Sequence, residues 1–141
     1  MQATQLHASA VSINNKAVLI LGQSGSGKSA FSLQLMALGG HLIGDDQVFL
    51  NMQNDKMVIS SHPNAMGRIE VRGVGVFEAL AANHVEIQCA VNLDREPSER
   101  LPKKQQFQIG LTNIEQYDLK GVSHGAAFIY LLLTNNLKQA F

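Results

Sequence analysis

The sequence predicts an α/β domain in which an antiparallel hairpin of a mixed sheet leads into a glycine-rich loop, and the loop into a helix. Two strand-like runs separated by Asn14 and Asn15 predict the hairpin. The octapeptide GQSGSGKS at residues 22–29 predicts the loop, and apolar residues at helical spacing follow it. Residues 1–141 suit a single domain, because a hydrophobic core of this size does not readily divide.

The hairpin is predicted by the runs LHASAVSI and KAVLILG, the first partly alternating and the second continuously apolar. Asn14 and Asn15 lie between them, and asparagine tolerates the positive φ of tight hairpin turns. We therefore expect His7 on the first strand of the hairpin. Most phosphate-binding loops follow a strand without a hairpin directly before it, so the pattern indicates a particular subclass.

A short helix of about three turns is expected after the loop. Its apolar residues recur at roughly helical spacing until two glycines supply a C-terminal stop. The apolar residues are Phe31, Leu33, Leu35, Met36 and Leu38, and the stop is Gly39–Gly40.

The following segments contain strands, turns and a second predicted helix. The run HLIGDDQVFLNM indicates a strand interrupted by two aspartates, and Asn54 with Asp55 indicates another hairpin turn. In RIEVRGVGVFEALAA, residues 68–82, charged and apolar residues alternate up to Arg72. After the two glycines of this run we expect a helix.

The second half of the chain begins with a buried strand at residues 84–94, HVEIQCAVNLD, which ends in polar residues. The charged run REPSERLPKKQQ contains two prolines and indicates a surface loop. Residues 107–141 contain a strand-like start, a glycine-containing break and a closing apolar helix.

Composition limits the classes of function. Eleven Lys and Arg residues balance eleven Asp and Glu residues, which gives no reason to expect nucleic acid or an anionic membrane as a partner. No run is long enough to span a membrane, and the amino-terminal residues lack the pattern of a signal peptide. The one cysteine, Cys89, suits a reducing compartment. We therefore expect a cytoplasmic protein.

The glycine loop matches the pattern G-x-x-x-x-G-K-[ST], with an apolar strand before it and a helix after it. In such a loop, successive N–H groups surround phosphate oxygens and the helix N-terminus adds positive potential. Lys28 would bridge the terminal phosphates, and the Ser29 hydroxyl would ligate Mg²⁺. The predicted nucleotide-binding residues are Gly22, Gln23, Ser24, Gly25, Ser26, Gly27, Lys28 and Ser29.

Asp45 and Asp46 are the candidates for the carboxylates that a phosphoryl-transfer site needs. One carboxylate would hold or position the metal, and one would accept a proton from an incoming nucleophile. Adjacent residues of a strand point to opposite faces, so we expect only one of the pair to face the phosphates. The residue types alone leave open which one.

Four features together resemble the catalytic domain of HPr kinase/phosphorylase, a bifunctional serine kinase that acts on the phosphocarrier protein HPr. They are His7, the loop ending in GKS, the Asp-Asp pair, and the signature I-E-V-R-G-x-G at residues 69–75. A glycine loop alone is common, whereas this combination is rare. The resemblance covers residues 6–78 well and weakens towards Arg100. It implies a P-loop kinase fold of the phosphoenolpyruvate-carboxykinase type.

The resemblance also implies a role for each matching residue. The glycine loop would bind ATP, and Ser29 and Glu70 would be the residues linked to Mg²⁺. Asp46 would accept the proton of the substrate serine and return it in the reverse reaction, with Asp45 in support. Further active-site positions are matched by His7, Lys28 and Arg100.

The sequence departs from the family pattern at several points. Gram-positive members carry acidic residues where this chain has Gln23 and Ala30, which should shift metal dependence or regulation. Because His7 lies near the start, the chain resembles the short proteobacterial form without an N-terminal domain. The C-terminal motif that the family uses for dephosphorylation has no convincing counterpart, so kinase activity is a safer inference than phosphorolysis. The family implies a homo-oligomer, a hexamer.

Two other functions stay open at this point. One is a P-loop kinase for a small molecule, because the wider fold resembles phosphoenolpyruvate carboxykinase. The other is a regulatory module that binds ATP and a partner without transferring phosphate. Retention of Asp45 and Asp46 argues against the regulatory module, and the IEVRG signature favours the HPr kinase over the small-molecule kinase.

Overall fold

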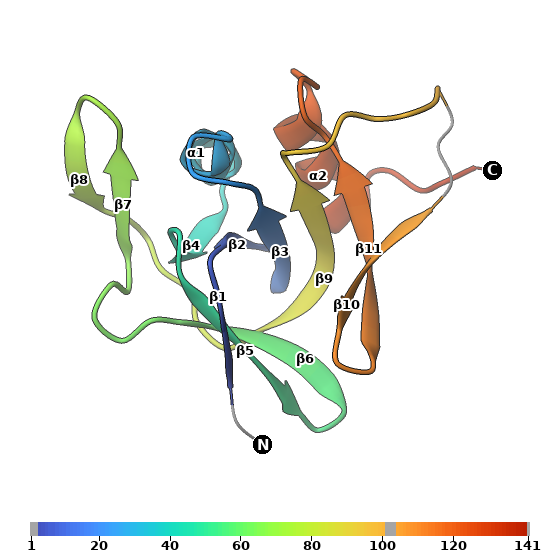
Figure 1. Ribbon diagram of the computed structural model, residues 1–141. Helices are drawn as coiled ribbons and strands as arrows, with labels where there is room; N and C mark the ends of the chain where they lie inside the picture. Colours follow the sequence, from blue (N-terminus) through green and yellow to red (C-terminus); the bar gives the residue numbers. More distant parts are fainter. Residues whose placement is uncertain (1–2, 101–103, 141) are drawn as a thin grey trace.

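The computed structural model describes residues 3–100 and 104–140 (Figure 1). Its helices are α1 (Lys28–Ala37) and α2 (Gly125–Leu133). Its strands are β1 (Thr4–Leu6), β2 (Ser9–Ile13), β3 (Lys16–Leu21), β4 (His41–Gly44), β5 (Val48–Gln53), β6 (Lys56–Ser61), β7 (Arg68–Val71), β8 (Gly75–Glu78), β9 (Val85–Asn92), β10 (Gln105–Ile109) and β11 (Thr112–Asp118).

Nine of these strands form one mixed sheet. Seven follow the order β1-β5-β6-β9-β3-β2-β4, while β11 pairs with β9 and β10 with β11. The pairs β3–β9 and β9–β11 are parallel, and the remaining pairs of this sheet are antiparallel. The predicted α/β class with a mixed sheet is therefore confirmed.

Both predicted hairpin turns are present. Asn14 and Asn15 have φ of 55° and 58°, and they join β2 to β3 in antiparallel register. Asn54 and Asp55, with φ of 52° and 65°, join β5 to β6 in the same way. Positive φ at both central residues gives a turn whose twist matches that of the flanking strands. The sheet therefore reaches the glycine loop through an antiparallel hairpin, as predicted.

The sheet buries side chains on both faces. On β3, Val18 and Ile20 belong to one core and Leu19 to the other, because successive residues of a strand point to opposite faces. Helices α1 and α2 cover the first core, where Leu35 and Ile129 are fully buried. The second core also receives side chains from β5, β6, β10 and β11.

Helix α1 begins at Lys28, within the last two residues of the glycine loop, and continues beyond the loop as predicted. The residues buried along it are spaced by three, one and three positions, which places them on one helical face. The helix ends at two glycines: the Gly39 N–H donates to Met36 O and the Gly40 N–H to Leu35 O. Gly39 has φ of 110°, which favours glycine, so the predicted stop acts as a Schellman C-cap.

Hairpin β7–β8 forms a separate two-stranded sheet that stands beside α1 (Figure 1). Ile69 of β7 is buried in the core beneath α1, and α1 also contacts β7. The four residues of β8 are exposed. An isolated two-stranded hairpin has marginal stability, so Ile69 is its anchor to the domain.

The structure corrects two sequence-based expectations of local structure. His7 does not lie on a strand, since it occupies a bend between β1 and β2. Residues 76–82 form no helix, because residues 76–78 belong to strand β8 and the backbone of residues 79–82 pairs with another segment. Leu80 O accepts from the Leu42 N–H, and the Ala82 N–H donates to Leu42 O. This pairing outweighs the helix propensity of a short run that has no cap of its own.

Strand β11, which pairs with β10, was not predicted from the sequence. Strand β11 has mostly polar residues, and only Ile114 and Gln116 of it are buried. Its register therefore depends on pairing with β9 more than on a hydrophobic pattern.

The parallel strands β3, β9 and β11 end at the same edge of the sheet. Leu21 lies opposite Asn92, and Asn92 lies opposite Asp118. Loops that follow parallel strands at one such edge are a common place for ligand sites. Within the described residues, neither helix is long and apolar enough to cross a membrane.

Candidate active site

The glycine loop is held at its start by the loop that follows β9. The Leu93 N–H donates to Leu21 O at 2.9 Å, which extends the pairing of β3 and β9 by one residue. The Gln23 N–H then donates to Asp94 Oδ2, also at 2.9 Å. A carboxylate that accepts a backbone N–H makes a charge-assisted hydrogen bond, so Asp94 fixes the first turn of the loop.

Ser26 packs against the first glycine of the loop. A Cβ atom on Gly22 would overlap Ser26 Oγ and lie 2.9 Å from Ser26 Cβ. The Ser26 hydroxyl is buried and, among the described residues, has no hydrogen-bond partner. A buried hydroxyl without a partner is uncommon, and here it is enclosed by the packing of Ser26 against Gly22.

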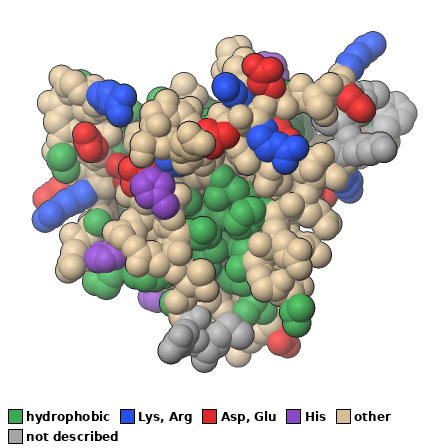
Figure 2. Space-filling model, viewed as in Figure 1, with side chains coloured by type: hydrophobic (Ala, Val, Ile, Leu, Met, Phe, Trp, Pro, Cys, Tyr) green, Lys and Arg blue, Asp and Glu red, His purple; other side chains and the backbone are tan. Residues whose placement is uncertain are grey.

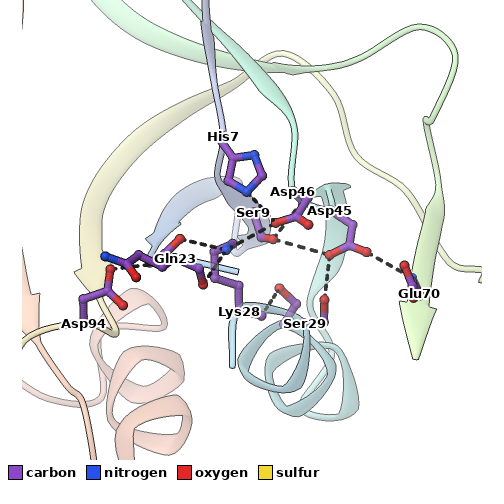
Figure 3. Close-up of polar contacts among 11 residues, drawn as sticks. His7, Ser9, Gln23, Lys28, Ser29, Asp45, Asp46, Glu70 and Asp94 are labelled. Carbon is purple, nitrogen blue, oxygen red and sulfur yellow. Dashed lines mark hydrogen bonds and ion pairs between the residues drawn. The ribbon is translucent and has the colours of Figure 1, made fainter. Parts of the chain in front are cut away.

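Lys28 is the first residue of α1, and its side chain is 4% exposed. Its ammonium donates to Gly22 O at 2.8 Å and to Gln23 O at 3.1 Å, and it lies 3.3 Å from Asp46 Oδ1. The ammonium is therefore folded back over the loop that it follows, with a carboxylate as its counter-charge (Figure 3).

Asp45 connects the glycine loop to hairpin β7–β8. Its Oδ1 atom accepts from the Ser29 hydroxyl at 2.9 Å, and its Oδ2 atom accepts from the Glu70 N–H at 3.0 Å. Glu70 thus reaches Asp45 through its backbone, and its exposed side chain lines the same pocket. The hydroxyl oxygen of Ser29 and the carboxylate of Asp45 thus lie together, and oxygen ligands of this kind suit a hard divalent cation.

Asp46 has a left-handed backbone, with φ of 66°. Its Oδ1 atom lies 3.4 Å from His7 Nε2 and 3.3 Å from Lys28 Nζ. The side chains of His7 and Asp46 are both more than half exposed. The Asp46 carboxylate is therefore accessible to a bound molecule while His7 and Lys28 lie beside it (Figure 3).

A pocket of about 420 Å³ joins these groups. The glycine loop, the start of α1, the aspartate pair and one end of hairpin β7–β8 line it. Figure 2 shows acidic, basic and histidine side chains near one another in the upper half of the face drawn there. The lining residues are Ser24, Gly25, Gly27, Lys28, Ser29, Ala30, Leu33, Asp45, Asp46, Glu70, Val71 and Arg72.

Most predicted site residues gather at this pocket or beside it, with one exception. His7 contacts Asp46 from the pocket's rim, and Gly22, Gln23 and Ser26 complete the loop behind its lining. Arg100 is exposed in the loop after β9, and it is outside the pocket lining that the described residues form. Arg72 lines the pocket instead, from the turn of hairpin β7–β8.

The expectation that only one aspartate faces the pocket is wrong. The alternation rule applies to strands, but β4 ends at Gly44 and the pair lies in the bend before β5. The left-handed φ of Asp46 turns the backbone there, so Asp45 and Asp46 both line the pocket.

Sequence reasoning missed two residues that hold the site together. Ser9 is fully buried and contacts both aspartates, but within the run LHASAVSI no pattern distinguishes it from its neighbours. Asp94 holds the start of the glycine loop. Its signal was present, because Asp94 lies two residues after the end of β9, and polar residues that follow a buried strand are common at the edge of a sheet where ligands bind.

The residues present fit a nucleoside triphosphate with Mg²⁺. The loop offers backbone N–H groups and a helix N-terminus, and the Lys28 ammonium adds positive charge. Mg²⁺ bound with a nucleotide takes one or two carboxylates plus phosphate oxygens and water. Asp45 offers one carboxylate, and the Ser29 hydroxyl beside it offers a further oxygen ligand. Within residues 3–100 and 104–140, no group of three or more His, Cys, Asp or Glu side chains is arranged to hold a metal ion by itself.

Comparison with known proteins identifies relatives. The family model of the HPr Serine kinase C-terminal domain matches residues 1–123. The HPr kinase/phosphorylase of Mycoplasma mycoides is 36% identical over 81 residues, which cover 57% of this chain and 26% of that protein. The HPr kinase/phosphorylase of an Exiguobacterium strain is 33% identical over 99 residues, which cover 64% of this chain and 32% of that protein. The chain thus spans between 26% and 32% of the length of these two curated relatives.

A solved structure has the same fold. It is the Hpr(Ser) kinase/phosphatase from Coxiella burnetii, with a TM-score of 0.79 and 23% sequence identity. The match covers 94% of this chain and 90% of that one. At this identity the likeness establishes the fold, while the family match rests on the sequence model over residues 1–123. The chain belongs to the HPr Serine kinase C-terminal domain family, as its combination of motifs predicted.

Proposed function

We propose that the chain is an ATP- and Mg²⁺-dependent serine kinase for the phosphocarrier protein HPr, with Asp46 as the proton acceptor. The observation that carries this proposal is the position of the Asp46 carboxylate. It lies 3.3 Å from the ammonium of the loop lysine, Lys28, and faces the pocket that the glycine loop lines. A base beside the terminal phosphates is where an incoming hydroxyl must lose its proton.

In the forward reaction the serine oxygen forms a bond to the γ-phosphorus of ATP. The serine proton passes to the Asp46 carboxylate, and the bond between the γ-phosphorus and the β–γ bridging oxygen breaks to release ADP. Lys28 would offset negative charge on the transferring group, and Arg72, which also lines the pocket, would do the same. Mg²⁺ supplies additional charge neutralisation when it is bound near Ser29, Asp45 and Glu70.

The reverse reaction is the second part of the proposal. Inorganic phosphate would attack the phosphorus of phosphoserine and form pyrophosphate, and protonated Asp46 would return its proton to the serine oxygen. By microscopic reversibility the same carboxylate serves both directions. The arrangement of Asp46, His7 and Lys28 supports the forward direction directly, and the reverse direction depends on room for phosphate in the same pocket.

A protein acceptor is favoured over a small molecule by the surface beside the pocket. Hairpin β7–β8 lines the pocket through Glu70, Val71 and Arg72, and it carries exposed apolar side chains on and beside it. Clustered exposed apolar groups next to a site indicate contact with a large partner. The exposed residues are Met66, Val74, Val76, Phe77 and Leu80, with 47% to 75% of each accessible.

The test is to incubate the purified chain with Mg²⁺, radiolabelled ATP and HPr from the same organism, beside Asp46→Asn. We expect label on HPr with the wild-type chain and a loss of at least about 100-fold with Asp46→Asn, the range in which a general base contributes. Absence of label with the wild-type chain refutes the HPr kinase. Equal labelling by the variant keeps HPr as the substrate and removes the proposed role of Asp46.

The phosphorolysis is tested by adding phosphate to labelled phospho-HPr and measuring pyrophosphate. A chain that forms phospho-HPr and yields no pyrophosphate is a kinase alone. Five expectations from the sequence stay predictions. They are the relation of the fold to phosphoenolpyruvate carboxykinase, the single domain, the cytoplasmic location, the hexamer and the role of Arg100.

A further inference from the structure

Ser9 is a fully buried residue whose hydroxyl contacts the aspartate pair of the candidate active site. It is the first residue of β2, and its exposed fraction is 0%. Its neighbours in the site are open to solvent, since the side chains of His7 and Asp46 are 63% and 55% exposed. A buried hydroxyl must find its hydrogen-bond partners within the protein, so its contacts show what it holds.

The Ser9 hydroxyl contacts both aspartates. It accepts a hydrogen bond of 3.0 Å from the Asp46 N–H, and it donates one of 3.4 Å to Asp45 Oδ1 (Figure 3). A hydroxyl can accept and donate at the same time, which an apolar residue of the same size cannot do. Among the described residues, no other side chain forms a hydrogen bond or an ion pair with both Asp45 and Asp46.

The contact to Asp46 acts on its backbone. Asp46 has φ of 66°, a left-handed conformation that is uncommon for residues with a side chain and that aspartate adopts more readily than most. This backbone conformation helps to set the direction in which the Asp46 side chain leaves the chain, and its Oδ1 atom lies near His7 and Lys28. A group that holds the Asp46 N–H therefore controls where the carboxylate lies.

We propose that Ser9 is a positioning residue for the aspartate pair, which fixes the Asp46 carboxylate beside Lys28 and the Asp45 carboxylate beside Ser29. Ser9 itself is buried and touches no reacting atom in this arrangement. The inference rests on the proposed function for its effect on catalysis, while its effect on the Asp46 backbone is independent of any activity. No sequence motif assigns a role to this residue.

The experiment compares Ser9→Ala with Ser12→Ala. Ser12 lies on the same strand and is also buried, at 5% exposure, and no side-chain hydrogen bond joins it to the aspartates in the described residues. It is therefore the matched control for loss of a buried hydroxyl from β2. Ser9→Cys keeps the shape of the side chain with a weaker hydrogen-bonding group, and it serves as the second variant should Ser9→Ala fold poorly.

The first measurement is amide hydrogen exchange at Asp46 in the chain without nucleotide. We expect the exchange rate to rise by about tenfold or more in Ser9→Ala and by an intermediate factor in Ser9→Cys, with no change in Ser12→Ala. Unchanged exchange at Asp46 in both Ser9 variants overturns the proposal. This measurement does not require phosphoryl transfer, so it stands whether or not HPr is the acceptor.

The second measurement is the kinetics of phosphoryl transfer. We expect kcat to fall by about tenfold or more in Ser9→Ala with KM for ATP within about twofold, because the loop that binds ATP keeps its own contacts. Equal losses of kcat in Ser9→Ala and Ser12→Ala indicate a structural effect and overturn the proposal. Faster exchange with unchanged kcat also overturns it. A wild-type chain that transfers no phosphate refutes the proposed function, and the exchange measurement then decides whether Ser9 positions Asp46.

Discussion

The Ser29 hydroxyl donates a 2.9 Å hydrogen bond to Asp45 Oδ1, which joins the last residue of the glycine loop to the bend between β4 and β5. The same carboxylate accepts the Glu70 N–H through its other oxygen. Asp46, one residue later, faces Lys28 instead. The two adjacent carboxylates thus have different neighbours. Asp45 contacts the Ser29 hydroxyl, which is expected to ligate Mg²⁺, and Asp46 contacts the loop lysine, Lys28. Their substitutions should have different effects.

Asp45→Asn should weaken the dependence of nucleotide binding on Mg²⁺. The amide keeps an acceptor for Ser29 and loses the negative charge that favours a divalent cation. We expect ATP affinity in excess Mg²⁺ to fall by about tenfold or more, and affinity without Mg²⁺ to change little. Isothermal titration with and without Mg²⁺ measures both. Asp46→Asn is the matched control, and an equal loss of Mg²⁺-dependent affinity there would contradict the division of roles.

Gly22→Ala should disrupt the glycine loop through Ser26. The new Cβ would overlap Ser26 Oγ and lie 2.9 Å from Ser26 Cβ, so the loop must shift. We expect ATP affinity to fall by about tenfold or more, since loop N–H groups that point at phosphates lose their alignment.

The double variant Gly22→Ala with Ser26→Gly separates this clash from other effects. Removal of the Ser26 side chain leaves the new methyl group without its two nearest neighbours. A double-mutant cycle should therefore show that the pair binds ATP better than Gly22→Ala alone. Additive losses in the cycle would mean that the clash with Ser26 is not the cause.

Leu80→Ser should weaken binding of the protein acceptor. Leu80 is 75% exposed beside hairpin β7–β8, which lines the candidate active site. We expect KM for HPr to rise severalfold, with KM for ATP unchanged, because the substitution removes apolar contact area outside the nucleotide pocket. Steady-state kinetics with each substrate varied checks this.

Leu111→Ser is the matched control for Leu80→Ser. Leu111 is 100% exposed in the turn between β10 and β11, on the opposite side of the molecule from hairpin β7–β8 (Figure 1). Substitution of either residue should leave the free energy of unfolding within about 0.5 kcal/mol of the wild-type value, as is usual at exposed positions. A rise in KM for HPr with both variants would mean that loss of any exposed leucine weakens the reaction, and it would contradict a specific contact at Leu80.

The glycine loop, the hairpin before it and the helix after it could be predicted from sequence because local rules determine them. Asn14 and Asn15 tolerate positive φ, and Gly39 supplies a left-handed C-cap; each requirement appears in a residue type. The family could be predicted because four short motifs occur together. These are properties of neighbouring residues, which a sequence displays directly.

The parts that sequence did not predict depend on partners distant along the chain. The Ser9 hydroxyl accepts a hydrogen bond from a backbone amide 37 positions later in the chain. The Asp94 carboxylate accepts one from a backbone amide 71 positions earlier. Residues 79–82 extend because β4 offers them backbone partners. Such contacts are set by the register of the sheet, and no local pattern in the chain specifies them.

Cys89 should be unreactive in the folded protein. It is the only cysteine of the chain and 2% exposed, and burial raises the pKa of its thiol to about 12, with a further contribution from Glu115. The thiolate is the reactive form. A thiol reagent at about pH 8 should therefore label Cys89 in the native protein only as fast as unfolding exposes the thiol. Labelling should become rapid in guanidinium. Fast labelling of the native protein would contradict the burial of Cys89.

Glu115 should give the domain a small acid-sensitive contribution to stability. Its carboxylate accepts a 2.7 Å hydrogen bond from the Tyr117 hydroxyl and lies 3.3 Å from Lys104 Nζ. The hydrogen bond from Tyr117 is the main cause that lowers the pKa of Glu115 below its ordinary value of 4.5, and Lys104 adds to it. The folded state therefore binds this proton less tightly than the unfolded state does.

The sign of the pH dependence follows from this lowered pKa. The contribution is fully present above the ordinary pKa of 4.5 and is lost as the pH falls through the lower pKa of the folded state. The side chain of Glu115 is 42% exposed, so solvent limits the contribution to below about 1 kcal/mol. Glu115→Gln keeps an acceptor for Tyr117 and removes the charge. Its free energy of unfolding should be lower than the wild-type value at about pH 7 and should approach that value towards about pH 3.

Urea unfolding of wild-type and Glu115→Gln proteins across this pH range measures the difference directly. Glu86→Gln is the matched control, because Glu86 lies on the neighbouring strand β9, 3.9 Å from Lys56 and without a tyrosine hydroxyl among its described contacts. Glu86→Gln should therefore show a smaller difference from the wild type at about pH 7, since an exposed ion pair alone contributes little. A Glu115→Gln difference that grows as the pH falls would have the wrong sign and would exclude Tyr117 and Lys104 as the groups that stabilise the charged form of Glu115.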